Sequence, residues 1–504
     1  MNLQYRLSSL FAMVAIVAVL SWTATMVPDY LDFALSLCML ISLFCVLAGT
    51  FVFCMLRFSR ATDLTEQAAA EARCFGRGAL GSLAVFIASL VLLTALSVLS
   101  GQPPTERQHV IESTMRPYAG KSVPGVEPAA LWGKVMCGYQ GWFSAPGDGS
   151  DQGWRHWGPG KCEPGACSVS MWPDMTELAA DEKFPTGFRH SDGSPAHAFS
   201  SYNRRTVLRH FKWMREYGID GVFVQRFAIE TIHPLDLRHR NVVLAHCREG
   251  ANLHGRTYAV MYDLSGLPAD SIDRVIDDWK ALVERMQITS DPAYQHHNGK
   301  PVVAVWGVGF NEPHRRYTLR QCARLVEFLK HDPDFGGCTV MLGLPTAWRT
   351  LDRDSVDDPA LHDLVLAADI VSPWTVGRYA NLEQVAAHRQ GRLRADIEWC
   401  QARGKEYLPV VFPGFKWHAL HPDARSTAPI PRLGGKFLWQ QFVEAKRAGA
   451  RMIYVAMFDE VDEGTAIFKC SNDPPGDEFV TFDGQPADHY LRLAGKGGLL
   501  LRGQ

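Results

Sequence analysis

The feature that most constrains the fold is an alternation, from about residue 130 onward, of short apolar runs with longer stretches of helical periodicity. Such an alternation predicts βα units arranged around a parallel sheet. The apolar runs are nearly continuous, as expected for strands that are buried on both faces. Eight runs are predicted to be strands: 134–139, 221–227, 257–264, 301–307, 338–344, 369–374, 407–415 and 451–458.

The stretches between these runs predict helices. Several end at a glycine directly before the next strand, as helix C-termini often do. An open doubly wound sheet would need a glycine-rich phosphate-binding turn after the first strand, and the sequence there, GYQGWF, is not one. Eight repeats therefore favour closure, and we predict an α/β fold, a (β/α)₈ barrel of the TIM type over residues 130–504. The clearest predicted helices are 203–218, 271–286, 318–330, 381–404 and 435–449.

Three further apolar runs open the chain, at about 7–27, 31–56 and 79–99. Each is long enough to cross about 30 Å of hydrocarbon as a helix. A cleaved signal peptide is the competing interpretation of the first run, but no small-x-small cleavage site follows it and two further runs come directly after. We expect residues 1–100 to form an anchor of three transmembrane helices, with the lipid bilayer as a partner.

The loop between the second and third apolar runs carries Arg57, Arg60, Arg73 and Arg77, whereas the link between the first two runs has no basic residue. By the positive-inside rule the arginine-rich loop is cytoplasmic, which places everything after residue 100 on the outer side of the membrane. We therefore expect a periplasmic or extracellular barrel. Residues 101–129 are rich in proline and polar residues, and this composition predicts a linker or stalk.

Charge and composition restrict the partners of the barrel. The net charge is −2, 21% of the residues are charged, and Lys and Arg form no basic tract, so we expect no nucleic-acid partner. The 14 Trp, 14 Tyr and 26 Phe either fill the core or offer flat rings to sugars. The twelve cysteines show no repeated CxxC spacing, and we predict no metal and no cofactor. Cys162 and Cys167 flank a Pro-Gly turn and could form a disulfide if the barrel is exported.

Polar and aromatic side chains gather where the predicted strands end. In a (β/α)₈ barrel the active groups lie at the C-terminal ends of the strands, so these residues are candidate substrate contacts. Each one alone is as readily explained as a structural residue, but their concentration at one end favours a binding site. The candidates are Tyr139, Trp142, Trp154, His156, Trp157, Gln225, Arg226, Tyr262, Asp263, Trp306, Trp374, Trp417 and His418.

The eighth predicted strand runs into FDEVDEGTAIF, which places Asp459, Glu460, Asp462 and Glu463 within five positions. Like charges this close raise at least one pKa, and a carboxylic acid that keeps its proton near neutral pH is the donor that glycosidic cleavage requires. A second, ionised carboxylate then acts as base or nucleophile. The other explanation is a calcium site or a solvated acidic turn. We predict Glu460 and Glu463 as the catalytic pair and Asp459 and Asp462 as substrate contacts.

The segment FDEVDEGTAI is similar to the FNEWHEGTQI-like segment of family 99 glycoside hydrolases, the endo-α-mannosidases, which are (β/α)₈ barrels. GYQGWF and WRHW resemble the aromatic first-strand loop of family 71/99-like proteins, and the resemblance covers about residues 130–495. It implies that Glu460 acts as base toward the 2-hydroxyl of the sugar, giving a 1,2-anhydro intermediate. It implies that Glu463 is the general acid/base and that the anomeric configuration is retained.

Among the departures from that segment, Asp459 stands in place of Asn, Val461 in place of Trp and Asp462 in place of His. The missing Trp and His would shape the sugar subsite, so mannose specificity does not transfer. We predict a membrane-anchored glycosidase that cleaves an α-linked glycan or polysaccharide outside the cytoplasm. The open alternatives are another linkage, as in an α-1,3-glucanase or a pentosidase, and a barrel that binds envelope glycans without cleaving them.

Overall fold

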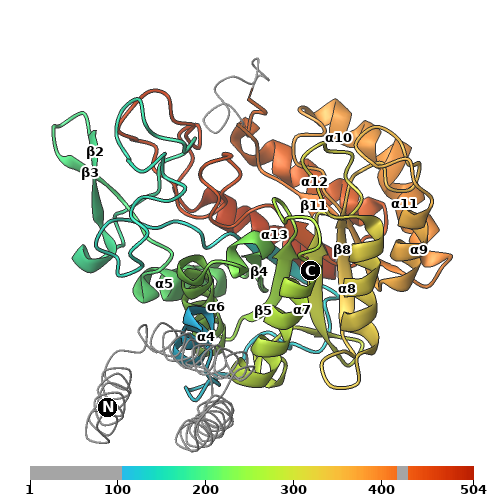
Figure 1. Ribbon diagram of the computed structural model, residues 1–504. Helices are drawn as coiled ribbons and strands as arrows, with labels where there is room; N and C mark the ends of the chain where they lie inside the picture. The colour runs from blue at the N-terminus through green and yellow to red at the C-terminus, as the bar shows by residue number, and fades with distance from the viewer. Residues whose placement is uncertain (1–104, 417–428) are drawn as a thin grey trace, which may run out of the picture. The chain divides into compact units, whose positions relative to one another are not determined.

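The computed structural model describes residues 105–416 and 429–504, which Figure 1 draws as a coloured ribbon. The chain divides into two compact units after Pro104, and the described residues all belong to the second unit. The predicted anchor, residues 1–100, lies outside the described residues. Within the described ranges, no helix is both long and apolar enough to cross a membrane.

One sheet forms the centre of the described unit. Its strands follow the order β10-β9-β8-β7-β5-β4-β1-β12-β11, and every neighbouring pair on this path is parallel. The eight predicted strands are all present, with the seventh divided in two. They are β1 Val135–Tyr139, β4 Gly221–Phe227, β5 Thr257–Asp263, β7 Lys300–Trp306, β8 Thr339–Leu344, β9 Ile370–Pro373, β10 Glu406–Tyr407, β11 Val410–Val411 and β12 Ile453–Val455.

The divided seventh strand joins the two ends of the sheet. β10 pairs with β9 and β11 pairs with β12, so both ends of the strand order lie in one chain segment. Pro409 separates the two pieces because it has no N–H to donate, but its carbonyl still accepts from Tyr454 N at 3.0 Å. On the other side, Leu408 N donates to Val371 O at 2.9 Å. The arrangement is consistent with the TIM-type barrel that the sequence predicted.

Helices alternate with the strands and cover the outside of the sheet (Figure 1). Local sequence sets their ends: Asn203 caps α5 by accepting from two backbone amides, and Gly218 ends it at φ 76°, a left-handed conformation that glycine adopts without strain. The five predicted helices correspond to α5, α7, α8, α10 with α11, and α12. The helices are α5 Arg204–Tyr217, α6 Pro234–His254, α7 Ile272–Ala281, α8 Leu319–His331, α9 Ala360–Ala367, α10 Leu382–His388, α11 Arg394–Gln401, α12 Lys436–Arg447 and α13 His489–Arg502.

The segment predicted as a linker, 101–129, is described from Thr105 onward and is folded. Helix α4 (Glu106–Thr114) begins after Thr105, whose side chain caps its N-terminus. α4 packs on α6, where Asn241 Nδ2 donates to Thr114 Oγ1 at 2.9 Å. From Thr105 onward this segment is therefore part of the barrel unit and not a free stalk.

A long excursion from the barrel follows β1 and spans residues 140–203. It contains the antiparallel hairpin of β2 (Phe184–Arg189) and β3 (Pro195–Ala198), which projects at one side of the barrel in Figure 1. Cys162 and Cys167 lie in this excursion, and both thiols are free. The excursion also supplies residues that surround the acidic turn after β12.

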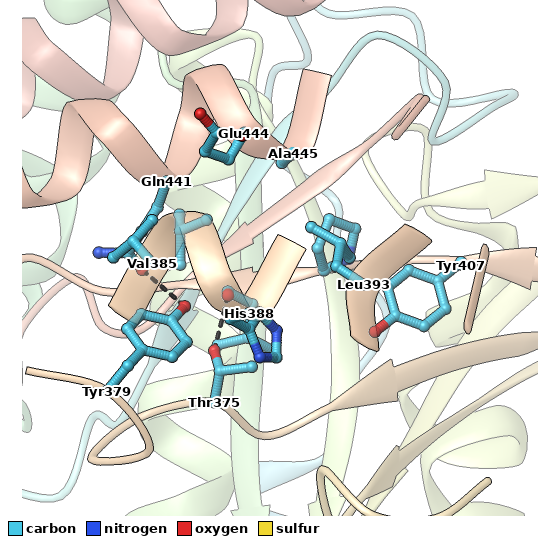
Figure 2. Close-up of a pocket in the computed structure, with 12 residues that line it drawn as sticks. Thr375, Tyr379, Val385, His388, Leu393, Tyr407, Gln441, Glu444 and Ala445 are labelled. Carbon is cyan, nitrogen blue, oxygen red and sulfur yellow. Dashed lines mark hydrogen bonds between the residues drawn. The ribbon is translucent and has the colours of Figure 1, made fainter. Parts of the chain in front are cut away.

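A small cavity lies between β11, α10 and α12, and Figure 2 shows the side chains that line it. Its volume of about 20 Å³ has room for one water molecule. Gln441 Oε1 accepts from Phe412 N and from Tyr379 Oη, each at 3.0 Å, and its Nε2 donates to Phe412 O at 2.8 Å. Gln441 thus supplies hydrogen bonds to the backbone directly after β11. This cavity belongs to the layer between strands and helices.

Candidate active site

Four acidic side chains follow β12, at the end of the barrel where parallel strands carry active groups. Asp459, Glu460 and Asp462 are buried, whereas Glu463 is partly exposed. The charge of Asp462 raises the pKa of Asp459 and of Glu460, and the charge of Glu460 raises the pKa of Glu463. These four residues, here called the acidic cluster, therefore form one electrostatic unit.

Asp459 ties the acidic cluster to the segment after β1. Its carboxyl oxygens accept from Gln140 N at 2.8 Å and from Gly141 N at 3.0 Å. Helix α6 holds the same two residues: Arg240 Nη1 donates to Gln140 O at 2.7 Å, and His239 Nε2 lies 3.1 Å from Gly141 O. Burial raises the pKa of Asp459 to about 7, against the effect of the two amides. Both carboxyl oxygens of Asp459 already accept hydrogen bonds from the backbone. Asp459 therefore positions the loop after β1 and does not have the role of substrate contact that we predicted for it.

Glu460 is held at both carboxyl oxygens by side chains. Gln140 Nε2 donates to Oε1 and Thr465 Oγ1 donates to Oε2. Burial and then the charge of Asp462 raise the pKa of Glu460 to about 8, and the two hydrogen bonds oppose this rise. Neither Gln140 nor Thr465 was among the predicted site residues. The available signal for Gln140 was its position directly after an apolar strand, at the end where a barrel carries its active groups.

Asp462 is fully buried, and among the described residues neither of its oxygens has a hydrogen-bond partner. His156 Nδ1 lies 3.6 Å from Asp462 Oδ2. Burial raises the pKa of Asp462 to about 8 and lowers the pKa of His156 to about 3. Burial therefore favours the uncharged form of both groups, a protonated carboxyl group beside a neutral imidazole.

Glu463 differs from Glu460 in its partners. Its carboxyl group has no hydrogen bond or ion pair to any residue in the described part of the chain. Burial, followed by the charges of Glu460, Asp462 and Asp263, raises its pKa well above the ordinary value. Glu463 thus combines a retained proton with partial access to solvent, which are the two properties that a proton donor to a bound molecule needs.

Asp263 ends β5 and belongs to the same site, since its charge raises the pKa of Glu463. Burial raises the pKa of Asp263 itself to about 6. The Ser265 amide, which donates at 2.8 Å, and the charges of Arg315 and Arg240 act in the opposite direction. Asp263 is therefore near enough to Glu463 for its charge to act on that carboxyl group.

The ring of Trp142 is covered by other rings. His156 stacks on it with centroids 3.9 Å apart and an angle of 5°, and Phe227 stacks on it at 5.2 Å and 24°. Its Nε1 is buried and has no hydrogen-bond partner in the described residues. Trp142 therefore supports His156 beside Asp462 and does not offer a free face to a sugar, contrary to our expectation.

Trp306 and Trp374 lie at the ends of β7 and β9, and their rings meet edge to face at 5.5 Å. Both are partly exposed. The ring of Tyr454, from β12, lies 6.3 Å from that of Trp374 in a similar edge contact. This aromatic pair is therefore better placed than Trp142 to contact a ligand at the mouth of the barrel. Trp154 is also partly exposed and packs against the core.

Comparison with solved structures identifies this architecture. The barrel has the fold of endo-α-mannosidases of family 99. The structure of the GH99 endo-α-mannosidase from Bacteroides thetaiotaomicron with bis-tris-propane matches with a TM-score of 0.54 and 15% identity, over 74% of this chain and 98% of that one. A second structure of the endo-α-mannosidase from this organism matches with a TM-score of 0.53 and 16% identity, over 74% and 99%. No protein-family model and no curated protein matches the sequence.

Five predicted substrate contacts are buried and have partners within the protein. Arg226 Nη2 and Tyr262 Oη donate to Asp278 on α7, at 2.6 and 2.7 Å, so both face the helix layer. Trp157 Nε1 donates to Phe199 O at 3.1 Å, Tyr139 Oη lies 2.9 Å from His210 Nδ1, and Gln225 Nε2 donates to Tyr454 Oη at 3.5 Å. Successive side chains of a strand point to opposite faces of the sheet. A position near the end of a strand therefore does not show whether a side chain faces the interior of the barrel or the helices. The five are Tyr139, Trp157, Gln225, Arg226 and Tyr262.

Two predicted contacts, Trp417 and His418, lie outside the described residues. Between residues 105 and 416 and from 429 to 504, no group of three or more His, Cys, Asp or Glu side chains is arranged to hold a metal ion.

Proposed function

We propose that this chain is a glycoside hydrolase that cleaves an α-linked glycan or polysaccharide, with Glu463 as general acid/base and Glu460 as base. The observation that supports the proposal is the asymmetry between the two glutamates. Glu460 is held by Gln140 and Thr465, whereas Glu463 has no such partner among the described residues. Two carboxyl groups whose surroundings separate their pKa values are the arrangement that divides an acid from a base.

The order of ionisation follows from these partners. Hydrogen bonds from Gln140 and Thr465 favour the charged form of Glu460, so Glu460 loses its proton before Glu463 does. Once Glu460 is charged, its field raises the pKa of Glu463 further. Around neutral pH the productive state therefore has an ionised Glu460 and a protonated Glu463.

The reaction that this state allows has two steps. Glu463 gives its proton to the oxygen of the leaving sugar, while Glu460 accepts the proton of the 2-hydroxyl as that oxygen bonds to the anomeric carbon. Water then opens the 1,2-anhydro sugar: Glu463 takes the proton of the water, and Glu460 returns its proton to the 2-oxygen. Two inversions at the anomeric carbon give retention.

The proposed substrate is an α-linked glycan or polysaccharide. The structures with the matching fold are named endo-α-mannosidases, which favours an α-linkage. Val461 and Asp462 replace residues that would shape a mannose subsite, so mannose is not part of the proposal. We place a sugar ring against Trp306 and Trp374, because these partly exposed rings lie at the mouth of the barrel.

We further propose that residues 1–100 anchor the enzyme in a membrane by three helices, with the barrel on the outer side. The support is the length of the three apolar runs and the arginines between the second and third. Protease treatment of intact cells that express the full chain tests this topology. Degradation of the barrel in cells whose outer barrier has been opened, with cytoplasmic proteins left intact, is the expected result. Protection of the barrel until the cytoplasmic membrane is broken would contradict it.

The proposed activity is tested on the full chain, purified in mild detergent. We would incubate it with a panel of α-mannans, α-glucans, xylans and arabinans, and follow the released sugars and their anomeric configuration. Glu463→Gln and Glu460→Gln are each expected to abolish hydrolysis while glycan binding survives, because the amide keeps the shape of the side chain and loses its proton chemistry. Glu327→Gln, at an exposed position of α8, is the matched control.

Each result of this experiment decides between the proposals. Release of an α-configured product that stops in both cluster variants supports the retaining mechanism. A product with inverted anomeric configuration would support the proposed hydrolase activity and would contradict the 1,2-anhydro mechanism. Binding of glycans without cleavage by the unmodified chain would favour the non-catalytic barrel instead.

A further inference from the structure

The excursion after β1 contains a tight turn whose ends are two cysteines. Ala166 N donates to Glu163 O at 2.9 Å, and Gly165 has a φ of 79°. With Pro164 before that glycine, the segment has the residues and the left-handed position of a type II turn. Cys162 and Cys167 are the residues directly outside it, so the chain reversal sets them opposite each other. The proximity of the Cys167 thiol raises the pKa of Cys162, in agreement with this placement.

The turn adjoins the residues that support the acidic cluster. Ser168, which follows Cys167, holds the His156 segment twice: its N donates to Trp157 O at 3.0 Å and its Oγ donates to His156 O at 3.2 Å. His156 in turn stacks on Trp142 and lies beside Asp462. A constraint on the turn is therefore passed to the acidic cluster through Ser168 and His156.

We propose that Cys162 and Cys167 are a reversible dithiol pair, whose disulfide locks the loop that holds His156 beside the acidic cluster. The oxidant is of the disulfide class, either an oxidised dithiol protein or oxidised glutathione. The pairing rests on the turn geometry and does not depend on the proposed hydrolase activity. Its persistence in the cell depends on the proposed export, because oxidising compartments maintain disulfides.

The two thiols differ in the way that disulfide exchange requires. Cys167 is partly exposed, and its pKa is lowered by the interaction with Cys162, whereas Cys162 is buried and its pKa is raised. The Cys167 thiolate attacks one sulfur of the oxidant and releases the other as a thiol. Cys162 then loses its proton and attacks the Cys167 sulfur, which releases the second thiol. The pair loses two electrons and two protons, and the oxidant gains them.

The remaining cysteines of the described residues offer a contrast. All are buried, and burial raises the pKa of each of these thiols. A buried thiol with a raised pKa reacts slowly because the thiolate is the nucleophile. Oxidation is therefore expected to be selective for the pair. These contrasting thiols are Cys137, Cys247, Cys322, Cys338, Cys400 and Cys470.

Peptide mapping of the full chain tests the pairing. Trypsin cleavage after Lys161 and Lys183 gives a peptide, 162–183, that contains these two cysteines and no others. After treatment with oxidised glutathione and alkylation, we expect this peptide without alkyl groups and about 2 Da lighter than its reduced form, because two hydrogens are lost. Dithiothreitol should restore two alkylation sites. A peptide alkylated at both cysteines after oxidation would overturn the proposal.

A second measurement tests the locking. Lys161 is well exposed, so trypsin can cleave after it in the native protein. We expect this cleavage to be several-fold slower in the oxidised form, and to be independent of redox state in the Cys162→Ser/Cys167→Ser variant. Equal rates in the oxidised and reduced forms of the unmodified chain would overturn the locking role. Neither measurement uses hydrolysis, so failure here leaves the glycosidase proposal standing, and failure of that proposal leaves these results unchanged.

Discussion

Replacement of Gln140 with Met tests whether Glu460 acts as the base and Glu463 as the acid. The change removes the amide that donates to Glu460 and leaves the backbone N–H that donates to Asp459. A hydrogen bond to a charged group contributes about 1.5–3 kcal/mol, and one pKa unit corresponds to about 1.4 kcal/mol. The pKa of Glu460, now about 8, should therefore rise by roughly one to two units.

The consequence is a loss of base at neutral pH. At pH 7 the ionised fraction of Glu460 should fall by about 10- to 100-fold, and kcat/KM should fall by the same factor. The assay is kcat/KM as a function of pH on the substrate that the glycan panel identifies. The acidic limb of the profile should move to higher pH by about one to two units, because that limb reports the base of the free enzyme.

Gln152→Met is the matched control, since Gln152 lies on the same excursion and its Nε2 donates at 2.9 Å to Asp236, outside the acidic cluster. It should leave the acidic limb in place. If Gln140→Met lowered kcat/KM equally at every pH, Gln140 would act on the substrate or on the loop, and the assignment of Glu460 as base would lose its support.

Three other changes give independent checks. Burial raises the pKa of Asp462 from its ordinary value of 3.8 to about 8, so its contribution to stability is fully present only below about pH 4 and is lost as the pH rises from there to 8. Asp462→Asn should therefore raise the thermal midpoint at pH 8 and change it little below about pH 4, and a lower midpoint at pH 8 would contradict this sign. Trp374→Ala should raise KM by about tenfold through loss of a stacking contact, with kcat little changed, and an unchanged KM would exclude the ring as a sugar platform. Arg226→Met should lower the free energy of unfolding in urea by about 3–5 kcal/mol, because the buried Asp278 loses its positive partner and keeps only the hydrogen bond from Tyr262, with partial recovery in Arg226→Met/Asp278→Asn. A raised KM at full stability would restore Arg226 as a substrate contact.

The strands were the most predictable part of the fold. A parallel barrel buries both faces of each strand, and the run 257–263, in which every residue is buried, shows why the sequence there is apolar throughout. The division of the seventh strand at Pro409 was not predicted from the sequence. The carbonyl of Pro409 still accepts a hydrogen bond from the neighbouring strand, so the apolar run on both sides of the proline has the composition of one continuous strand. The helix α4 (Glu106–Thr114) was missed because proline and polar residues around it resemble a linker in composition, although Thr105 and Gln108 form a capping box.

The acidic residues of the candidate site could be predicted from the sequence, whereas the residues that form hydrogen bonds with them could not. Gln225 and Arg226 are adjacent at the end of β4, yet one points to Tyr454 inside the barrel and the other to Asp278 in the helix layer. The sequence gives no sign of this difference, since Asp278 lies on a helix whose orientation depends on packing. Gln140 is a similar case, because its role depends on residues more than 300 positions later.

The acidic turn is held by segments that lie far from it in the chain. Ser170 N and Met171 N donate to Val461 O at 2.8 and 3.1 Å, and Lys416 N donates to Glu463 O at 2.8 Å. These bonds satisfy backbone carbonyls and leave the carboxyl charges uncompensated. Protonation is the remaining way to lower the repulsion, because buried like charges cannot all ionise. The burial that makes this turn unfavourable at high pH therefore also keeps a proton at Glu463, where a glycosidic oxygen would need it.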